Sequence, residues 1–243
     1  MKILIIRHAD PDYSIDSLTK KGHKEAAFLA KKLSKLDIKS FYVSPLGRAQ
    51  DTASYTLKKM NRTAETCLWL REFGVVIDRP DQKDKKNIPW DWLPQDISKY
   101  DELYDKNLWH ENFIMKNGKV GEEYKWVTEE LDKLLAKHGY IRNGKFYNAE
   151  KANNDTIVFF CHFGVECVLL SHLINTAPSV LWQGLCAAPS SVTTINTEER
   201  RKGIASFRIS SFGDISHLYA NDEPPAFSAR FCECFDNKDE RHD

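Results

Sequence analysis

The sequence predicts an α/β protein, a three-layer sandwich with a mostly parallel, twisted sheet of about six strands and helices on both faces. Two observations predict this class. Short, almost uninterrupted apolar runs, which are typical of strands buried on both faces, occur at residues 3–6 and 156–161. Segments in which apolar residues recur every three or four positions alternate with such runs, as in β-α-β units. We also expect one antiparallel edge strand and an inserted cap segment.

The composition predicts one ordinary globular domain over residues 1–243. Lys plus Arg and Asp plus Glu number 35 each, so there is no basic footprint for nucleic acid or an anionic membrane. No apolar run reaches the roughly 20 residues of a membrane helix, and the chain opens without the pattern of a secretory leader. The six cysteines include no C-x-x-C pair, and we expect a reduced, cytoplasmic protein.

The first strand, residues 3–6, stops at an adjacent cation and imidazole, Arg7 and His8. Ligands of open α/β sheets collect at the carboxyl ends of such strands. The pair either caps a strand end at the surface or forms part of a binding site. This stretch alone leaves both interpretations open.

A second cation follows the next predicted strand. Thr19 is expected to cap a helix, and residues 38–43 are expected to form a strand. Ser44-Pro45 then has the signature of a helix start, a side-chain acceptor followed by a ring already set to helical φ. Arg48 falls in the first turn, where a cation opposes the helix dipole unless it faces an anion. We therefore favour an anion-binding role for Arg48 over a surface role.

Residues 63–70 predict a third strand, which ends at Arg71 and Glu72. The pattern then breaks over about residues 74–125, a stretch rich in proline and aromatic residues. A structureless loop of that length is uncommon inside a compact domain, so we expect an insertion that packs over the sheet as a cap or lid. Its aromatic residues fit either a core or a ligand-facing wall.

The second half of the chain adds another histidine at a strand end. Residues 122–138 predict a long helix, and the strand over residues 156–161 ends at His162, just before another helix. Residues 191–196 and 204–210 are expected to pair as an antiparallel hairpin at the sheet edge. The short polar tail from about residue 236 is expected to fray.

These residues suit phosphoryl chemistry. Two guanidinium groups and a cationic histidine match a tetrahedral dianion, because each planar fork can hold two phosphoryl oxygens. The sequence has no Gly-rich phosphate loop, so side chains must meet the charge. A neutral imidazole can act as the nucleophile, and a protonated carboxyl can give its proton to the departing alkoxide. The candidate residues are Arg7, His8, Arg48, Glu72 and His162.

Two patterns could also hold a metal ion. His8, Asp10 and Asp12 form an H-x-D-x-D string, but aspartates that flank a proline are usually turn formers. Cys232 and Cys234 lack the further Cys or His ligands of a zinc site. We therefore expect neither a metal nor another cofactor.

Several motifs resemble those of the histidine phosphatase (phosphoglycerate mutase-like) superfamily, in the family's order, over about residues 1–72 and 150–220. The similar segments are Arg7-His8-Ala9, Leu18-Thr19-x-x-Gly22, Ser44-Pro45-Leu46-x-Arg48-Ala49, His162-Phe163-Gly164 and Gly213-Asp214-Ile215-Ser216-His217-Leu218. The resemblance implies a mostly parallel sheet with helices on both faces and no cofactor. It also implies a role for each site residue: a phosphohistidine on His8, a phosphoryl group held by Arg7, Arg48 and His162, and proton donation by Glu72.

Other positions depart from the family pattern. Ala9 stands where glycine is usual, and Cys161 and Phe163 replace the commoner Ser and Gly. The assignment of Glu72 rests only on its place after the predicted strand, so Asp10 and Glu166 remain alternative donors.

The region after the first motif favours a phosphatase over a mutase. Mutases commonly continue this motif with Glu-Ser and an Asn six residues beyond the histidine. Here Asp10-Pro11 follows, and Ser14 holds the Asn position.

We therefore predict a metal-independent phosphomonoesterase, a histidine acid-type phosphatase, whose partner is a small-molecule phosphate ester rather than nucleic acid or membrane. The alternatives are a phosphoglycerate-type mutase and a catalytically idle phosphate-binding or regulatory module. The sequence predicts neither the substrate nor the oligomeric state.

Overall fold

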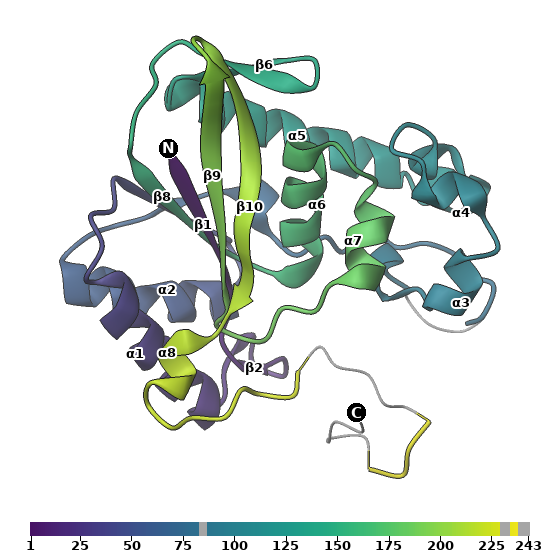
Figure 1. Cartoon of the computed structure of the whole chain (residues 1–243). Coiled ribbons are helices and arrows are strands. Elements are labelled where there is room, and N and C mark those ends of the chain that lie inside the picture. Colours follow the sequence, from purple (N-terminus) through teal and green to yellow (C-terminus); the bar gives the residue numbers. More distant parts are fainter. Residues whose placement is uncertain (83–86, 229–233, 238–243) are drawn as a thin grey trace.

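The structure, a computed structural model, describes residues 1–82, 87–228 and 234–237. The charged patch at residues 83–86, Cys232 and the predicted tail beyond residue 237 lie outside these ranges. Figure 1 shows a central sheet with helices on both faces, so the predicted α/β class is confirmed.

The main sheet has eight strands in the order β5-β4-β8-β1-β9-β10-β7-β6. The bounds are β1 Lys2–Arg7, β4 Ser40–Val43, β5 Glu65–Thr66, β6 Tyr140–Asn143, β7 Phe146–Ala149, β8 Thr156–Cys161, β9 Val192–Arg201 and β10 Ile204–Asp214. Strands β5, β4, β8 and β1 are parallel, and β9, β10, β7 and β6 form an antiparallel edge. The sheet exceeds the expected six strands partly because residues 140–149 add the hairpin β6–β7 to that edge. A separate small sheet pairs β2 (Pro11–Asp12) with β3 (Ser17–Leu18).

Helices α1 and α2 cover one face of the main sheet, and α5, α6 and α7 cover the other (Figure 1). The α-helices are α1 Lys20–Leu33, α2 Gly47–Met60, α3 Pro94–Ile97, α4 Phe113–Asn117, α5 Val120–Lys137, α6 Phe163–Ile174, α7 Pro178–Gly184 and α8 Ser216–Tyr219. Thr19 caps α1 as predicted, because its side chain accepts a hydrogen bond from the Gly22 N–H. No helix in the described part of the chain is both long and apolar enough to cross a membrane.

Strand β1 shows how one strand serves two cores. Ile3 and Ile5 pack into the core beneath α5, α6 and α7, whereas Leu4 and Ile6 pack into the core beneath α1 and α2. None of these four side chains is more than 4% exposed. Successive strand residues point to opposite faces, so an uninterrupted apolar run is what a strand buried on both faces requires.

The predicted third strand is wrong over most of its length. Only Glu65–Thr66 pairs with β4, and Leu68–Leu70 forms a 3₁₀ helix, η1. Trp69 and Leu70 are both buried, whereas Leu68 is 65% exposed. A strand would place adjacent side chains on opposite faces, and here two neighbours must both reach the core.

The start of α2 also differs from the prediction. The helix begins at Gly47, two residues after Pro45, with Leu46 at the N-cap position and no side-chain cap. Ser44 does not cap it because its hydroxyl is directed to His162 and the Leu46 N–H. Arg48 nevertheless lies in the first turn, as predicted.

The stretch that was predicted to be an insertion contains several short helices joined by irregular segments. Three 3₁₀ helices, η2 Pro89–Asp91, η3 Asp101–Tyr104 and η4 Trp109–Glu111, accompany α3 and α4 before α5 begins. Trp92 and Trp109 are each 1% exposed and belong to the larger core. Trp90 is only half-buried, so its surroundings differ from those of the core tryptophans.

The predicted antiparallel hairpin is confirmed, with longer strands than expected. Strand β9 continues through residues 197–201, the chain turns at Lys202 and Gly203, and β10 begins at Ile204. Gly203 has φ +80°, the left-handed conformation that suits glycine in a tight turn.

Candidate active site

Parallel pairing of β1 with β8 brings the two histidines together. Arg7 pairs in register with Cys161, so His8 and His162 follow at the same edge of the sheet. The His8 N–H donates to the Cys161 carbonyl at 2.9 Å, and the imidazole centroids are 5.1 Å apart. Both side chains are almost fully buried.

The His8 ring has a defined tautomer. Its Nδ1 lies 2.8 Å from the Ala9 carbonyl oxygen, which can only accept, so Nδ1 carries the proton and Nε2 has the free lone pair. Burial lowers the pKa of His8 well below its usual value, and the positive charges of Arg7 and Arg48 lower it further. The hydrogen bond to the Ala9 carbonyl acts in the opposite direction but does not outweigh them. The free protein therefore has a neutral His8 near pH 7.

His162 forms a 2.7 Å hydrogen bond between its Nε2 and the Ser44 hydroxyl. Burial lowers the pKa of His162 well below its usual value, and His8, Arg48 and Arg7 lower it further. The expected cationic histidine is therefore neutral in the unliganded site, because desolvation and two nearby guanidinium groups disfavour a further positive charge.

The two arginines are partly engaged by the protein. Arg7 Nη1 donates to the Ala187 carbonyl at 2.5 Å and to the Ser228 carbonyl at 3.3 Å. Arg48 Nη1 lies 2.5 Å from Asp16 Oδ1. The other Asp16 oxygen accepts a hydrogen bond from the Gly47 N–H, so this carboxylate occupies the first turn of α2. Burial acts to raise the pKa of Asp16, but the Gly47 N–H and Arg48 outweigh it and the pKa is lowered.

Three buried ring or guanidinium nitrogens of these residues have no partner among the described residues: Arg7 Nε, Arg48 Nε and His162 Nδ1. Unpartnered buried donors are uncommon in proteins because they lose their bonds to water on folding. Their presence on three neighbouring candidate ligands is the arrangement that an anion would complete.

Glu72 is half-buried, and its Oε1 accepts hydrogen bonds from the Phe73 N–H at 2.8 Å and the Val165 N–H at 3.1 Å. Burial of the carboxyl group raises its pKa, against the opposing effects of the Phe73 N–H and Arg7. A raised pKa favours the protonated form of the carboxyl, which is the form that a general acid needs.

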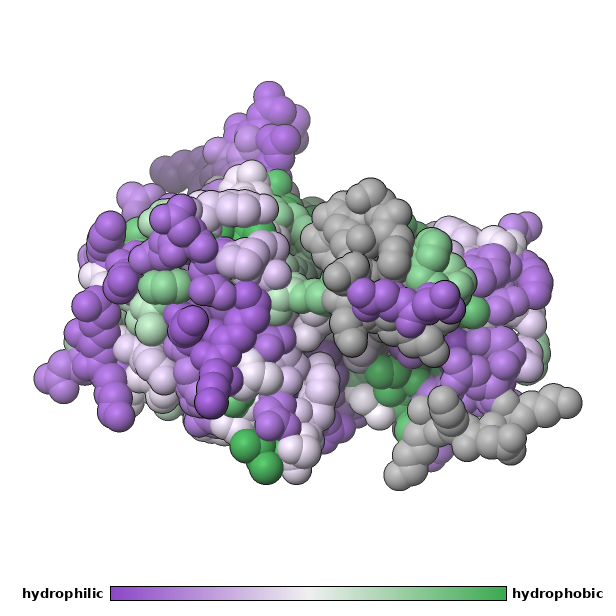
Figure 2. All heavy atoms as spheres, turned by 90° about the horizontal axis from the view of Figure 1, so that it is seen from below, coloured by the Kyte–Doolittle hydropathy of each residue, from purple (hydrophilic) through white to green (hydrophobic). Residues whose placement is uncertain are grey.

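A cavity of about 400 Å³ is lined by three of the five predicted site residues, Arg7, Arg48 and Glu72, whereas His8 and His162 are not among its lining residues. It is lined by Arg7, Tyr13, Arg48, Glu72, Ile88, Trp90, Phe163 and Ser228. Figure 2 views the molecule from the side at which β1 and β8 end. Hydrophilic side chains dominate the half that contains α1 and α2, and the half that contains α3 and α7 shows both hydrophilic and hydrophobic side chains.

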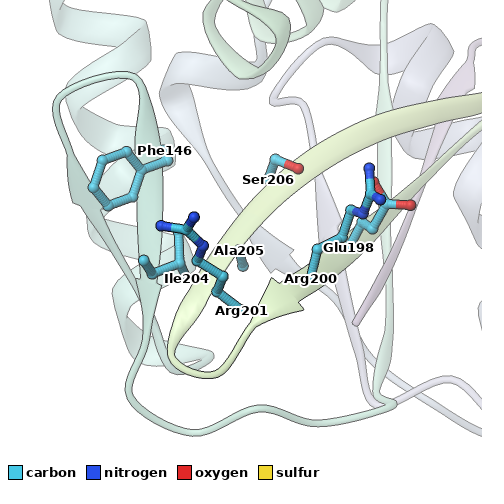
Figure 3. A pocket seen from close by; sticks show the side chains of 7 residues that line it. All are labelled: Phe146, Glu198, Arg200, Arg201, Ile204, Ala205 and Ser206. Carbon is cyan, nitrogen blue, oxygen red and sulfur yellow. The ribbon is translucent and has the colours of Figure 1, made fainter.

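A second cavity, of about 420 Å³, lies at the far end of the β9–β10 hairpin. Phe146, Ile204 and Arg201 lie near one another in it (Figure 3). Strand β9 runs antiparallel to β1, with Asn196 opposite Lys2. The residues of β9 after Asn196 therefore extend past the start of β1, whereas His8 follows the end of β1. This cavity does not belong to the histidine cluster.

The family model for the histidine phosphatase superfamily (branch 1) matches residues 3–210. The chain belongs to the histidine phosphatase superfamily. A 2,3-bisphosphoglycerate-dependent phosphoglycerate mutase of Thermoplasma acidophilum is 36% identical over 86 residues, which cover 31% of this chain and 43% of the mutase. The match thus spans less than half of that relative.

Solved structures show the same superfamily fold. A mutant phosphoserine phosphatase of Entamoeba histolytica in complex with phosphoserine has a TM-score of 0.57 at 18% identity, over 89% of this chain and 98% of its own. A mycobacterial glucosyl-3-phosphoglycerate phosphatase has a TM-score of 0.55 at 17% identity, over 87% and 98%. Bacillus stearothermophilus YhfR has a TM-score of 0.56 at 20% identity, over 89% and 98%. These similarities concern the fold.

The alternative carboxyl groups of this histidine phosphatase superfamily member lie outside the lining of the cavity. Asp10 accepts hydrogen bonds from the Thr19 and Ser228 hydroxyls at 2.6 and 2.9 Å. Glu166 is 1% exposed, and neither of its oxygens has a hydrogen bond of ordinary geometry among the described residues. Burial raises the pKa of Glu166 to about 7, although Thr193 and Arg7 act to lower it. Of the three candidates, Glu72 is the one that lines the cavity.

The H-x-D-x-D string of His8, Asp10 and Asp12 lies in a turn, as the proline between the two aspartates predicted. Asp12 accepts hydrogen bonds from the backbone N–H and the hydroxyl of Ser14. Within the described residues, no group of three or more His, Cys, Asp or Glu side chains is arranged to hold a metal ion.

Sequence reasoning did not identify Asp16, Tyr13 or Ser228 as neighbours of the site. Asp16 reaches Arg48 across 32 sequence positions, and Ser228 reaches Arg7 across 221. No local pattern marks either contact. The Ser44 bond to His162 was also missed, because a serine before a proline has a sufficient explanation as a helix cap.

Proposed function

We propose that this chain is a metal-independent phosphomonoesterase that forms a phosphohistidine on His8. The observation that carries the proposal is the hydrogen bond from His8 Nδ1 to the Ala9 carbonyl. It leaves Nε2 unprotonated, and the lowered pKa of His8 keeps the ring neutral and nucleophilic near pH 7.

In the first step, His8 Nε2 forms a bond to phosphorus while the bond between phosphorus and the ester oxygen breaks. Arg7, Arg48 and His162 would stabilise the charge on the equatorial oxygens. The carboxyl group of Glu72 would give its proton to the departing alkoxide, a contribution that is typically worth about 10²–10⁴-fold. In the second step, Glu72 accepts a proton from water, which attacks phosphorus and releases inorganic phosphate and His8.

The experiment measures hydrolysis of p-nitrophenyl phosphate in the presence of EDTA by the wild type and by His8→Ala. We expect EDTA-resistant turnover in the wild type, an acid-labile phosphoenzyme on quenching, and neither in His8→Ala. His110→Ala is a matched control, because His110 is 38% exposed and does not line the cavity. Retained turnover in His8→Ala would sink the mechanism. If no phosphate ester is hydrolysed, the site is a binding or regulatory module.

A mutase is the second candidate function, because the Thermoplasma relative bears that name. It predicts that a phosphoryl group passes from the phosphoenzyme to a second substrate hydroxyl rather than to water. Release of inorganic phosphate from 3-phosphoglycerate, without formation of 2-phosphoglycerate, would exclude it.

A further inference from the structure

The active-site cavity has both charged and apolar lining residues. Arg7, Arg48 and Glu72 are the charged ones, and apolar side chains supply most of the remaining lining. These apolar residues, the aromatic wall, are Tyr13, Ile88, Trp90 and Phe163. An ester held by its phosphoryl group at the arginines would therefore have apolar side chains beside its leaving group.

Trp90 and Phe163, two residues of the aromatic wall, are held in place by contacts within the protein. Trp90 Nε1 donates a hydrogen bond to the Phe73 carbonyl at 2.9 Å, and the ring meets Phe163 edge to face at a centroid distance of 6.2 Å. Because its N–H is already used, the indole offers a ligand apolar contact rather than a donor. Tyr13 stands at the open side, with its ring 67% exposed and 5.3 Å from the Arg48 guanidinium.

The cavity has no spare cation for a charged leaving group among the described residues. Arg7 and Arg48 are the only cations in the described lining, and both serve the phosphoryl group in the proposed mechanism. Arg48 is also paired with Asp16. A carboxylate in the leaving group would meet Glu72 and the apolar wall, and an anion buried without a partner is costly.

The wall continues beyond this cavity. A smaller cavity of about 260 Å³ shares Trp90 and Phe163 with the first and is also lined by Trp92 and Trp182. This second cavity therefore adds aromatic side chains next to the wall, together with the polar side chains of Asp91 and Gln183.

We propose that the substrate is a phosphate monoester whose leaving group is uncharged and contains an aromatic or similarly flat apolar ring that packs on the aromatic wall. This inference rests on the proposed phosphatase function and names its substrate class. This class differs from the small, carboxylate-bearing alcohols in phosphoserine and 3-phosphoglycerate, with which structures of the Entamoeba phosphatase were determined.

The test compares three esters of unactivated alcohols: 2-phenylethyl phosphate, ethyl phosphate and O-phosphoserine. All three release an alkoxide, so differences in kcat/KM report recognition more than leaving-group reactivity. We expect 2-phenylethyl phosphate to exceed both others by at least about tenfold in kcat/KM, which corresponds to ~1.4 kcal/mol.

Two wall variants then locate the recognition. Trp90→Ala and Tyr13→Ser should each lower the ratio of kcat/KM for 2-phenylethyl phosphate to that for ethyl phosphate, by about tenfold for Trp90→Ala. Tyr13 is largely exposed, so its variant remains informative if Trp90→Ala fails to fold. Trp126→Ala is the matched control, since Trp126 packs on Arg71 outside the cavity and should leave the ratio unchanged. Competitive inhibition by inorganic phosphate reports whether phosphate binding by the arginines is intact in each variant.

Equal kcat/KM values for the three esters, or a preference for phosphoserine, would overturn this inference while the proposed phosphatase function stands. A ratio that is unchanged in both wall variants would also overturn it. Absence of hydrolysis of every ester by the wild type would overturn the phosphatase function and this inference together.

Discussion

Ala9 contributes to the site through its backbone. Its carbonyl accepts the hydrogen bond from His8 Nδ1, and its N–H donates to the Thr52 hydroxyl at 3.0 Å. The methyl group is buried in a small cluster with Leu18 and Ala26. A position whose function needs only a carbonyl and an N–H tolerates a side chain when the space behind it is apolar, which accounts for alanine where the family usually has glycine.

The pKa of His8 predicts how activity depends on pH. An ordinary imidazole is half protonated near pH ~6.5 and loses its nucleophilic lone pair below that value. Burial and Arg7 lower the pKa of His8 well below this value, so the neutral form persists to lower pH. We expect kcat/KM at pH 5.5 to stay within about threefold of its value at pH 7, after correction for ionisation of the substrate. A tenfold loss over this interval would contradict the neutral nucleophile.

The proposed role of Glu72 predicts a dependence on the leaving group. Glu72→Gln removes the proton that the alkoxide needs and leaves an isosteric side chain in the cavity. We expect kcat/KM, which reports the first step, to fall by about 10²–10⁴-fold for ethyl phosphate and by much less for p-nitrophenyl phosphate, because nitrophenolate leaves without protonation. Both are measured by release of inorganic phosphate. Normal turnover of ethyl phosphate by Glu72→Gln would remove Glu72 from this role.

The start of α6 connects the proposed proton donor to the aromatic wall. A Cβ at Gly164 would lie 2.5 Å from Trp90 Cδ1 and 2.7 Å from Glu72 Oε1. We therefore expect Gly164→Ala to displace the Glu72 carboxyl and lower kcat/KM for ethyl phosphate by at least about tenfold, with a smaller effect on kcat/KM for p-nitrophenyl phosphate. The control is Gly184→Ala at the end of α7, where a Cβ would meet no atom within 4 Å. Equal activity of Gly164→Ala and Gly184→Ala would show that a methyl group at Gly164 does not displace the Glu72 carboxyl.

Local sequence patterns predict the helices and strands whose burial or capping follows directly from neighbouring residues in the chain. Strand β8 has the predicted bounds, and Thr19 caps α1, because continuous burial and a capped first turn leave direct marks in the sequence. The segment at residues 63–70 is apolar too, but its neighbours Trp69 and Leu70 are directed into one core by packing with distant residues. That choice between strand and 3₁₀ helix is made by tertiary contacts, which local propensity does not contain.

The topology of the whole sheet explains why the cluster of site residues could be predicted and the aromatic wall could not. Strands β4, β8 and β1 are adjacent and parallel, so the residues that follow them must meet at one edge. This rule alone was enough to predict that four of the candidate residues cluster: Arg7, His8, Arg48 and His162. Trp90 and Trp92 are two residues apart in the same stretch, yet one lines the cavity and the other is buried in the core. Their difference depends on how the whole stretch packs.

Glu166 predicts how the stability of the whole molecule depends on pH. Its pKa rises from the ordinary 4.5 to about 7 in the folded protein, chiefly because burial disfavours the charge. Between these two values the folded state holds a proton that the unfolded state has released, so the contribution of Glu166 to stability is lost as pH rises from 4.5 through about 7. At ~1.4 kcal/mol for each pKa unit, the loss between pH 4.5 and pH 8 is about 3 kcal/mol. Gln cannot ionise, so the free energy of unfolding of Glu166→Gln, relative to wild type, should be higher at pH 8 than at pH 4.5 by this amount.

Urea denaturation at the two pH values measures this difference in the free energy of unfolding. The control is Glu129→Gln, because the Glu129 side chain on α5 is 54% exposed. If Glu166→Gln changes the free energy of unfolding equally at both pH values, Glu166 does not carry the raised pKa.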